Sequence, residues 1–327
     1  MSSEYAGADV LVTGGLGFIG SNLVHRLVES GSDVTVLDSV DDEYGGNWFN
    51  VAKVEDSIDV AIGDIRDEGT IVDLIDGKDF IFHLAAQLSR PISISDPQFD
   101  VTVNCTGSLN VLQGARESST NPVVVFTSSQ AVFGSPSELP LTEESPDDPI
   151  DIYGANKSAA EDYFNIYQRV HGVSTRSVRL TNVYGPRAQL NNPKYGVINK
   201  FVRLAFQGET LTVYEPGTMR RDPVFVGDVI DGLLLAGTEG DAGEDYIVGS
   251  GKSFTIKALA STVVDAVGQG SVELTEWPEN WDSIRVGDIE VDNTKARREL
   301  GWEPSVSLKE GMKRTADYFD GNLNEYF

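Results

Sequence analysis

The most constraining feature of the sequence is a set of three glycines near the amino terminus. Gly14, Gly17 and Gly20 lie between a short apolar run at residues 9–13 and an amphipathic segment at residues 20–30. The run predicts a strand and the segment predicts a helix, so the glycines occupy the turn between them. Glycines in such a turn let the backbone approach a pyrophosphate, which the free N–H groups of the following helix can bind. The segment therefore predicts a dinucleotide-binding turn.

Further short apolar runs follow along the first half of the chain, separated by segments of helical length. They lie at residues 34–38, 59–62, 80–84, 123–127 and 175–180. Strands that alternate with helices pair in parallel through crossovers, so we predict an α/β fold with a doubly wound parallel sheet of the Rossmann type. Beyond residue 180 the pattern is less regular. We therefore assign residues 1–180 to a cofactor-binding domain and residues 181–327 to a smaller substrate-binding domain.

Residues at the ends of the predicted strands indicate which dinucleotide is bound. Asp38 ends the second strand, 18 residues beyond Gly20. A carboxylate there can bond both hydroxyls of an adenosine ribose and repels a 2′-phosphate, which favours NAD over NADP; the alternative is a solvated acid in a turn. Asp64 follows the third strand and could meet the adenine amine. Ala85 and Ala86 follow the fourth strand and could pass beneath the nicotinamide ribose.

A tyrosine and a lysine four residues apart form the candidate catalytic pair. Tyr153 and Lys157 lie in a segment that reads as the start of a helix, so they share one helix face. A neighbouring ammonium and a positive nicotinamide ring would favour the phenolate and let Tyr153 shuttle a proton. Lys157 can also hold the ribose hydroxyls. Ser129 lies just past a strand end, where its hydroxyl could bond the reacting oxygen.

The histidines do not suggest further chemistry. His83 begins a loop of small residues with no acid or second histidine beside it, so we expect a packed or hydrogen-bonded side chain. The spacing of His25, His83 and His171 is not that of metal ligands, and we propose no metal site.

Together these motifs resemble the extended short-chain dehydrogenase/reductases. The resemblance covers nearly the whole chain, and the motifs occur in the family's order. It rests on Thr13 to Gly20, Asp38, His83 to Ala86, Asn104, Phe126 to Gly134, Tyr153 to Lys157, Arg179 to Pro186, Arg220 to Asp228 and Leu300 to Pro304.

The resemblance implies roles for individual residues. It implies Ser129, Tyr153 and Lys157 as the catalytic residues, with Asn104 as a residue that helps to position the lysine. The NAD contacts that we expect are Gly14, Gly17, Phe18, Ile19, Gly20, Asp38, Asp64, Ile65, Leu84, Ala85, Ala86, Asn104, Tyr153, Lys157 and Thr181.

The residues after Ser129 bear on the reaction. The resemblance implies an Asp-Glu pair in 4,6-dehydratases where this chain has Gln130 and Ala131, and a glutamate in sugar-nucleotide decarboxylases where Ala131 stands. Glutamine is no proton donor at neutral pH and alanine has no polar side chain, so both reactions are disfavoured. The pattern is most similar to that of the NAD-dependent 4-epimerases of nucleotide-diphosphate sugars.

A diphosphate substrate requires cations, and the resemblance implies Arg221 and Arg285 as its ligands. Asn182 is expected to touch the sugar or the diphosphate, and Ser129 the reacting hydroxyl. The chain departs from UDP-galactose 4-epimerases at Phe133, where a tyrosine is common, and in a short stretch after Asp288. The sugar, the nucleotide base and the position that is epimerised therefore stay open.

The charge of the chain restricts its partners. The formal net charge is −26 and the acids are spread over the whole chain. Such a charge opposes binding to nucleic acid and to an anionic membrane surface. High salt screens the repulsion, so a halophile's salt-rich interior is one explanation and an ordinary acidic protein is the other. With a single cysteine, Cys105, and no apolar run of the roughly 20 residues of a membrane span, we expect a cytoplasmic protein. We also expect a homodimer.

Two other classes of function stay open. An oxidoreductase would release NADH after acting on a sugar nucleotide or a small hydroxy compound. A redox sensor would keep the fold without turnover, although the intact Ser129, Tyr153 and Lys157 oppose that reading.

Overall fold

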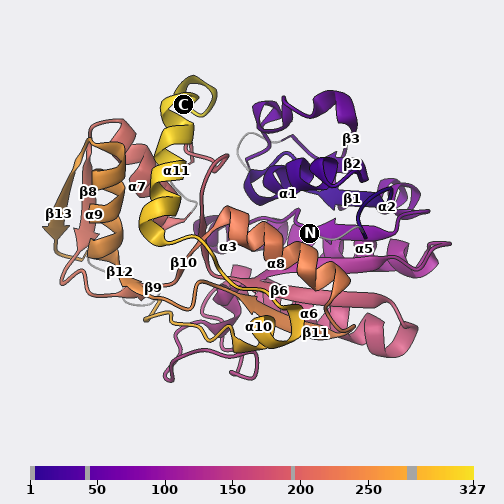
Figure 1. The fold of residues 1–327 in the computed structure, drawn as a ribbon. Helices are drawn as coiled ribbons and strands as arrows, with labels where there is room; N and C mark the ends of the chain where they lie inside the picture. The colour runs from indigo at the N-terminus through magenta and orange to yellow at the C-terminus, as the bar shows by residue number, and fades with distance from the viewer. Residues whose placement is uncertain (1–3, 41–44, 193–195, 278–285) are drawn as a thin grey trace.

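The computed structural model describes residues 4–40, 45–192, 196–277 and 286–327 (Figure 1). Its centre is a seven-stranded parallel sheet with the strand order β11-β6-β5-β4-β1-β2-β3. The predicted α/β fold with a doubly wound parallel sheet is therefore confirmed. The strands of this sheet are β1 (Asp9–Thr13), β2 (Asp33–Asp38), β3 (Ile58–Ile62), β4 (Phe80–His83), β5 (Val123–Ser129), β6 (Ser174–Leu180) and β11 (Glu244–Val248).

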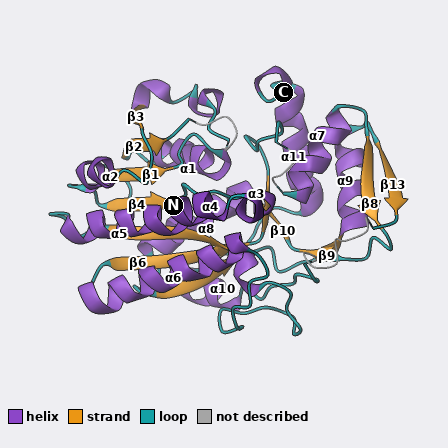
Figure 2. Ribbon diagram, turned by 180° about the vertical axis from the view of Figure 1, so that it is seen from behind, coloured by secondary structure: helices purple, strands orange, loops and turns teal. Residues whose placement is uncertain are grey.

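Helices cover both faces of the sheet, and those of one face are seen in front in Figure 2. Along β1, Val10 and Val12 pack into the core beside α1 and α8, whereas Leu11 packs into the core beside α2, α5 and α6. This alternation follows from the two-residue period of a strand. The helices associated with the sheet are α1 (Phe18–Glu29), α2 (Glu68–Ile75), α3 (Arg90–Ser95), α4 (Pro97–Val101), α5 (Gly107–Glu117), α6 (Ile152–His171), α8 (Val226–Thr238) and α10 (Thr294–Leu300).

A smaller group of elements lies to one side of the sheet, at the left of Figure 1. Here β8 (Thr210–Tyr214) pairs in parallel with β13 (Ser271–Thr275), and α9 packs against α7 and α11. The helices are α7 (Val197–Phe206), α9 (Ile256–Val267) and α11 (Leu308–Asp320). Two short strand pairs complete the described strands: β7 (Asn182–Tyr184) with β10 (Pro223–Phe225), and β9 (Arg220–Arg221) with β12 (Phe254–Thr255).

The two halves of the chain interleave. Strand β11 comes from the second half but pairs in parallel with β6, where Tyr246 lies opposite Val178. Helix α8, also from the second half, packs on β5 and β6. The division at residue 180 stays a prediction. Two elements that follow this residue, α8 and β11, belong to the sheet and its covering layer.

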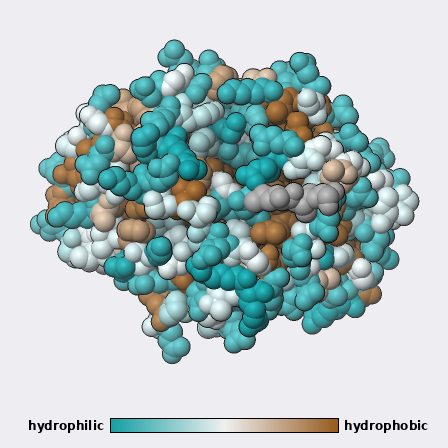
Figure 3. Space-filling view, in the orientation of Figure 1, coloured by the Kyte–Doolittle hydropathy of each residue, from teal (hydrophilic) through white to brown (hydrophobic). Residues whose placement is uncertain are grey.

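Hydrophilic side chains cover most of the face seen in Figure 3. None of the described helices combines the length and the apolar character that a membrane span requires.

Helix α6 carries the candidate catalytic pair, and its ends are well defined. Asp151 caps its start, because its carboxylate accepts a hydrogen bond of 2.8 Å from the backbone N–H of Gly154. Gly172 ends the helix in the left-handed conformation, with φ of 72°. The first turns of the helix lie beside the end of β5, where the Nζ of Lys157 reaches the backbone oxygen of Thr127.

Candidate active site

A cavity of about 760 Å³ runs along the carboxyl ends of the parallel strands and on toward β8 and α7. That position is expected for a ligand site in an open α/β sheet. Most predicted site residues line it, namely Gly14, Gly17, Phe18, Ile19, Gly20, Asp38, Asp64, Ile65, Leu84, Ala85, Ala86, Ser129, Tyr153, Lys157, Thr181, Asn182 and Arg221. Asn104 is not among the lining residues, and Arg285 lies outside the described residues.

The glycine turn leaves one end of this cavity open to a phosphate. Gly14 has φ of +71°, and a Cβ on Gly20 would lie 2.1 Å from the carbonyl oxygen of Gly14. Larger residues at either position would therefore distort the turn. No side chain caps the start of α1, so its first N–H groups face the cavity without a competing partner from the capping residue Gly17. This geometry suits the pyrophosphate of a dinucleotide.

Asp38 braces the same turn. Its Oδ2 accepts a hydrogen bond of 2.9 Å from the N–H of Leu16, and its Oδ1 accepts one of 2.9 Å from the N–H of Val40. Burial raises the pKa of Asp38, and the two backbone bonds act against that rise. Each carboxylate oxygen keeps a second lone pair, so the side chain can still accept from two ribose hydroxyls.

The loops after β3 and β4 form the next part of the wall. Asp64 binds Arg66, with 2.6 Å between Oδ2 and Nη2, and this bond lowers the pKa of Asp64. The hydroxyl of Thr13 accepts hydrogen bonds from the N–H groups of Leu84 and Ala85. The turn after β1 and the loop after β4 are therefore fixed to each other.

Ser129, Tyr153 and Lys157 meet in the middle of the cavity. The Oγ of Ser129 accepts a hydrogen bond of 3.1 Å from the N–H of Ala131, and Ser129 lies close enough to Tyr153 to lower its pKa. The Nζ of Lys157 donates a hydrogen bond of 2.9 Å to the backbone oxygen of Thr127. The end of β5 and the first two turns of α6 thus hold the three side chains together.

Burial dominates the protonation of the tyrosine. It raises the pKa of Tyr153 to about 12, while Ser129 acts to lower it. The expectation that the lysine ammonium and the nicotinamide ring together favour the phenolate stays a prediction. Burial also lowers the pKa of Lys157 to about 8. Further positive charge at the site is needed to make Tyr153 a base.

His83 is packed and hydrogen-bonded, as the sequence predicted. Its Nδ1 lies 2.9 Å from the hydroxyl of Thr13 and its Nε2 lies 3.1 Å from that of Ser108. Its ring stacks on Phe126 and Phe164. Burial lowers the pKa of His83 to about 3, so the ring is neutral.

The far end of the cavity carries the candidate substrate residues. The Nε2 of Gln130 donates a hydrogen bond of 3.1 Å to the Oδ1 of Asn182, which fixes both amides at the cavity wall. The guanidinium of Arg221 donates to the backbone oxygens of Arg220 (2.6 Å) and Gly287 (2.8 Å). Burial lowers the pKa of Arg221 to about 10, so it is a cation at neutral pH. The hydroxyl of Thr181 donates to Asp222 at 3.3 Å.

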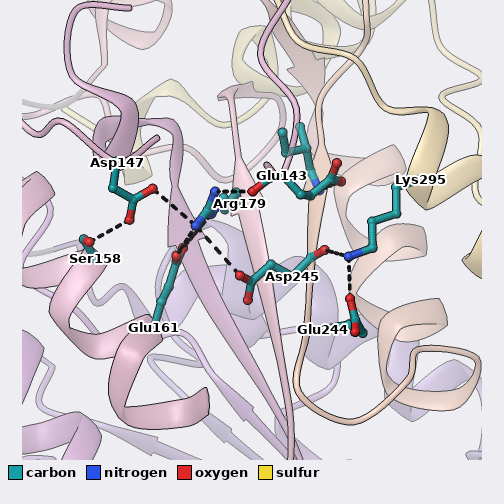
Figure 4. Close-up of polar contacts among 9 residues, drawn as sticks. Glu143, Asp147, Ser158, Glu161, Arg179, Glu244, Asp245 and Lys295 are labelled. Atoms are coloured by element: carbon teal, nitrogen blue, oxygen red, sulfur yellow. Dashed lines mark hydrogen bonds and ion pairs between the residues drawn. The ribbon is translucent and has the colours of Figure 1, made fainter. Parts of the chain in front are cut away.

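A cluster of charged side chains around Arg179 supports α6 at Glu161 (Figure 4). Arg179 on β6 binds Glu161, and its Nη2 also lies 3.4 Å from Asp147 and 3.8 Å from Asp245. Glu161 follows Lys157 by four residues, so both side chains lie on one face of α6. Sequence reasoning used Arg179 only as part of a family motif and missed this cluster, because its members come from four separate segments.

Sequence reasoning also missed Asp100, which is completely buried beside this site. Its carboxylate accepts hydrogen bonds from the side-chain amides of Asn104 (3.1 Å) and Asn156 (2.6 Å). The one available signal was the four-residue spacing from Asp100 to Asn104, which places both on one helix face.

Comparison with known proteins identifies the family. A family model described as GDP-mannose 4,6 dehydratase matches residues 11–315. The chain belongs to the NAD-dependent epimerase/dehydratase family. UDP-glucose 4-epimerase of Mycolicibacterium smegmatis is 36% identical to it over 313 residues, covering 94% of this chain and 97% of that protein.

Solved structures of epimerase/dehydratase family members share the fold. UDP-glucose 4-epimerase of Thermotoga maritima with UDP-glucose gives a TM-score of 0.88 at 33% identity, covering 96% of this chain and 99% of that chain. The dTDP-glucose 4,6-dehydratase DesIV of Streptomyces venezuelae, which contains NAD, also gives 0.88, at 32% identity with coverages of 97% and 98%. The chain is therefore a member of a nucleotide-sugar epimerase/dehydratase family, and these similarities do not separate the two reactions.

Proposed function

We propose that the protein is an NAD-dependent epimerase that inverts C4 of the sugar in a nucleotide-diphosphate sugar. The observation that carries the proposal is that, among the described residues, no carboxylate lines the cavity wall next to Ser129 and Tyr153. Among the described residues that line the cavity, the carboxylates are Asp38 and Asp64. Both lie at the cofactor end of the cavity. Asp38 ends β2 and Asp64 follows β3, whereas Ser129 ends β5, which is three strands away from β2 in the sheet.

Dehydration and decarboxylation need an acid or base beyond the tyrosine. A dehydratase must remove a proton from C5 and protonate the hydroxyl that leaves C6. At the two positions after Ser129 this chain has Gln130, whose amide is held by Asn182, and Ala131. Epimerisation at C4 requires only hydride and proton transfer at one carbon, which the residues present can perform.

The side chains of this chain supply the proton transfer. NAD, when bound, supplies the hydride acceptor and adds positive charge beside Tyr153, which favours the phenolate. Tyr153 then accepts the proton of the C4 hydroxyl, while Ser129 hydrogen-bonds the same oxygen. Lys157 holds the ribose hydroxyls of the cofactor. After the keto sugar turns over, Tyr153 returns the proton to the C4 oxygen; bound NAD would supply the hydride chemistry of the inversion.

The cofactor assignment is supported by the first half of the cavity. The uncapped start of α1 and the turn at Gly14 leave room and N–H groups for a pyrophosphate. Asp38 opposes a 2′-phosphate, which favours NAD over NADP. Asn104 does not line the cavity, so we propose that it acts through neighbouring residues and does not touch NAD.

The substrate assignment is supported by the second half. Arg221 presents a cation to the cavity and can attract phosphate oxygens there. Asn182 begins β7, lines the cavity and is hydrogen-bonded by Gln130, the residue after Ser129, and we propose that it touches the sugar or the diphosphate. Arg285 remains a proposed second phosphate ligand on the basis of the resemblance alone.

Turnover of defined sugar nucleotides tests the proposal. The NAD-loaded protein is incubated with UDP-glucose and separately with UDP-galactose. The products are separated by chromatography, and their molecular masses are measured by mass spectrometry. We expect an isomer of unchanged mass without net NADH. A product lighter by water or carbon dioxide would contradict the proposed reaction. Accumulation of one NADH per product would favour the alternative, an NAD-dependent dehydrogenase.

We also propose that the protein forms a homodimer. Helices α3 and α4 pack against α6, and these three helices expose apolar side chains that a second copy would cover. They are Ile94, Val101, Ile152, Ile166 and Val170. Light scattering during gel filtration is expected to give twice the monomer mass of 35.4 kDa. The proposed setting is a salt-rich cytoplasm, in which the charge of −26 is screened.

A further inference from the structure

Asp100 is a buried carboxylate without an ion-pair partner in the described part of the chain. It lies in α4 and is 0% exposed. Its Oδ1 accepts hydrogen bonds from Asn104 (3.1 Å) and Asn156 (2.6 Å), and its Oδ2 accepts one from the Nε2 of Gln87. Three neutral amides, from three segments of the chain, thus surround one carboxylate.

The orientation of two of these amides is fixed by the backbone. The Oδ1 of Asn104 accepts from the N–H of Gln87 (3.1 Å), and its Nδ2 donates to the Gln87 oxygen (2.9 Å). The Oε1 of Gln87 accepts from the N–H of Ser89, and its Nε2 donates to the Ser89 oxygen (3.0 Å). Exchanging oxygen and nitrogen in either amide would break both backbone bonds. Both amides must therefore present N–H groups to Asp100, which is the arrangement that an ionised carboxylate requires.

Burying an ionised carboxylate without a cation is costly, so its position needs a reason. The charged groups that face Lys157 are Asp100 from α4 and Glu161 from α6, with Cys105 as a weaker titratable neighbour and His83 neutral. Asp100 and Glu161 both oppose the lowering of the Lys157 pKa by burial. The charge of Glu161 is already paired with Arg179.

We propose that Asp100 is a positioning residue whose buried negative charge balances the Lys157 ammonium and whose hydrogen bonds fix Gln87 and Asn104 behind the cofactor loop. Gln87 lines the cavity directly after Ala85 and Ala86, so the same carboxylate acts on the loop and on the lysine. The inference rests on the role of Lys157 in the proposed function. It also gives Asn104 a defined task, because Asn104 connects Asp100 to the backbone of Gln87.

Removing the charge has a predictable sign. Asp100 raises the pKa of Lys157 and also raises that of Tyr153. A neutral side chain at this position therefore lowers both. Lys157 must keep its proton and Tyr153 must lose one, so both limbs of the pH profile move to lower pH. A side chain with a merely structural role would reduce activity or stability without moving either limb.

The test compares Asp100→Asn with the parent in two measurements. The titration of the Lys157 Nζ is followed by NMR on ¹⁵N-lysine protein, with Lys157→Met to assign the signal. The second measurement is the pH profile of UDP-glucose turnover by NAD-loaded protein. We expect the lysine midpoint and both limbs to fall by about one pH unit. Unchanged midpoints in folded Asp100→Asn protein would overturn the proposal.

Two further variants separate charge from packing. Asn156→Ala removes one hydrogen bond but keeps the carboxylate, so the midpoints should match the parent. The double variant Asp100→Asn, Asn156→Asp moves the charge across the 2.6 Å hydrogen bond that joins the two side chains and should restore the parent midpoints. If Asp100→Asn does not fold, the double variant decides, since shifted midpoints there would contradict the proposal.

The two measurements distinguish this inference from the proposed function. A shifted lysine titration in a protein that does not convert UDP-glucose would support Asp100 as the counter-ion and count against the epimerase. Conversion of UDP-glucose with an unshifted lysine would do the reverse.

Discussion

Arg179 binds Glu161 through both Nε and Nη2, with N–O distances between 2.6 and 3.1 Å, at a site from which water is almost excluded. This bidentate pair fixes α6 to β6 directly beneath Lys157. Asp147 and Asp245 also face the guanidinium, so Arg179 forms ion pairs with three carboxylates.

Arg179→Met should therefore be strongly destabilising. Removing the cation leaves Glu161 as an unpaired charge in the interior, which costs about 3–5 kcal/mol. Urea denaturation measures the loss. Arg179→Met combined with Glu161→Leu should recover part of it, since no buried carboxylate then remains at position 161. A loss under about 1 kcal/mol for the single variant would contradict the importance of the pair.

Tyr153→Phe should abolish turnover while NAD still binds. The change removes one oxygen that transfers the proton, and such groups contribute about 10²- to 10⁴-fold in rate. Turnover of UDP-glucose and NAD titration by fluorescence measure the two effects. Tyr167→Phe on the same helix is the matched control, because Tyr167 binds Gln113 away from the cavity. Near-normal turnover by Tyr153→Phe would remove it from the proposed mechanism.

Asp38→Ala should weaken NAD binding about tenfold or more and reduce the preference over NADP, because two ribose hydrogen bonds and the repulsion of a 2′-phosphate are lost. In the parent protein, NAD affinity should also fall as the pH drops through the raised pKa of Asp38, where the carboxylate becomes protonated. Asp33→Ala, at the opposite end of β2, should leave both properties unchanged. If the parent and the Asp38→Ala protein prefer NAD over NADP to the same extent, Asp38 has no role in cofactor selection.

Arg221→Ala should raise the KM for the sugar nucleotide about 10- to 100-fold and spare NAD binding, because a charge-assisted contact to the diphosphate is lost. Steady-state kinetics measure the change. Arg220→Ala is the control, since Arg220 binds Ser253 and Glu290 and does not line the cavity. If both variants behave alike, Arg221 has no special contact with the substrate.

Stability should rise with salt. A net charge of −26 repels itself at low ionic strength, and the Debye length shortens to about 3 Å at 1 M salt. Thermal melts at low and at molar potassium chloride are expected to show a higher midpoint in high salt. Equal midpoints would reject adaptation to a salt-rich interior.

The sequence predicted the first six strands within two residues at each end. Most of these strands are short, mainly apolar segments, and such a pattern has few other interpretations; β6 (Ser174–Leu180) is more polar. Strand β11 was not predicted, because Glu244–Val248 begins with two acids and is recognisable only by its pairing with β6. Strand β5 also continues to Ser129, which places this residue in the sheet and not just beyond it.

The cavity residues that belong to motifs could be predicted from the sequence. The buried residues that hold them in place could not. Asp100 is surrounded by Gln87, Asn104 and Asn156, and only the spacing to Asn104 is local in sequence. The pKa of Tyr153 depends on burial, which no motif records. Local patterns identify the groups that do chemistry, but desolvation and counter-charges arise from the tertiary fold.

Strand β11 comes late in the sequence, and this affects the chain during its synthesis. While the ribosome has released only the first 180 residues, β6 has a free edge, and that edge offers unpaired backbone groups to any other extended chain. The sheet is complete only after residues Glu244–Val248 have left the ribosome and paired with β6. A nascent or truncated dinucleotide-binding half is thus an aggregation hazard that the full-length chain removes by adding its own last strand to the sheet.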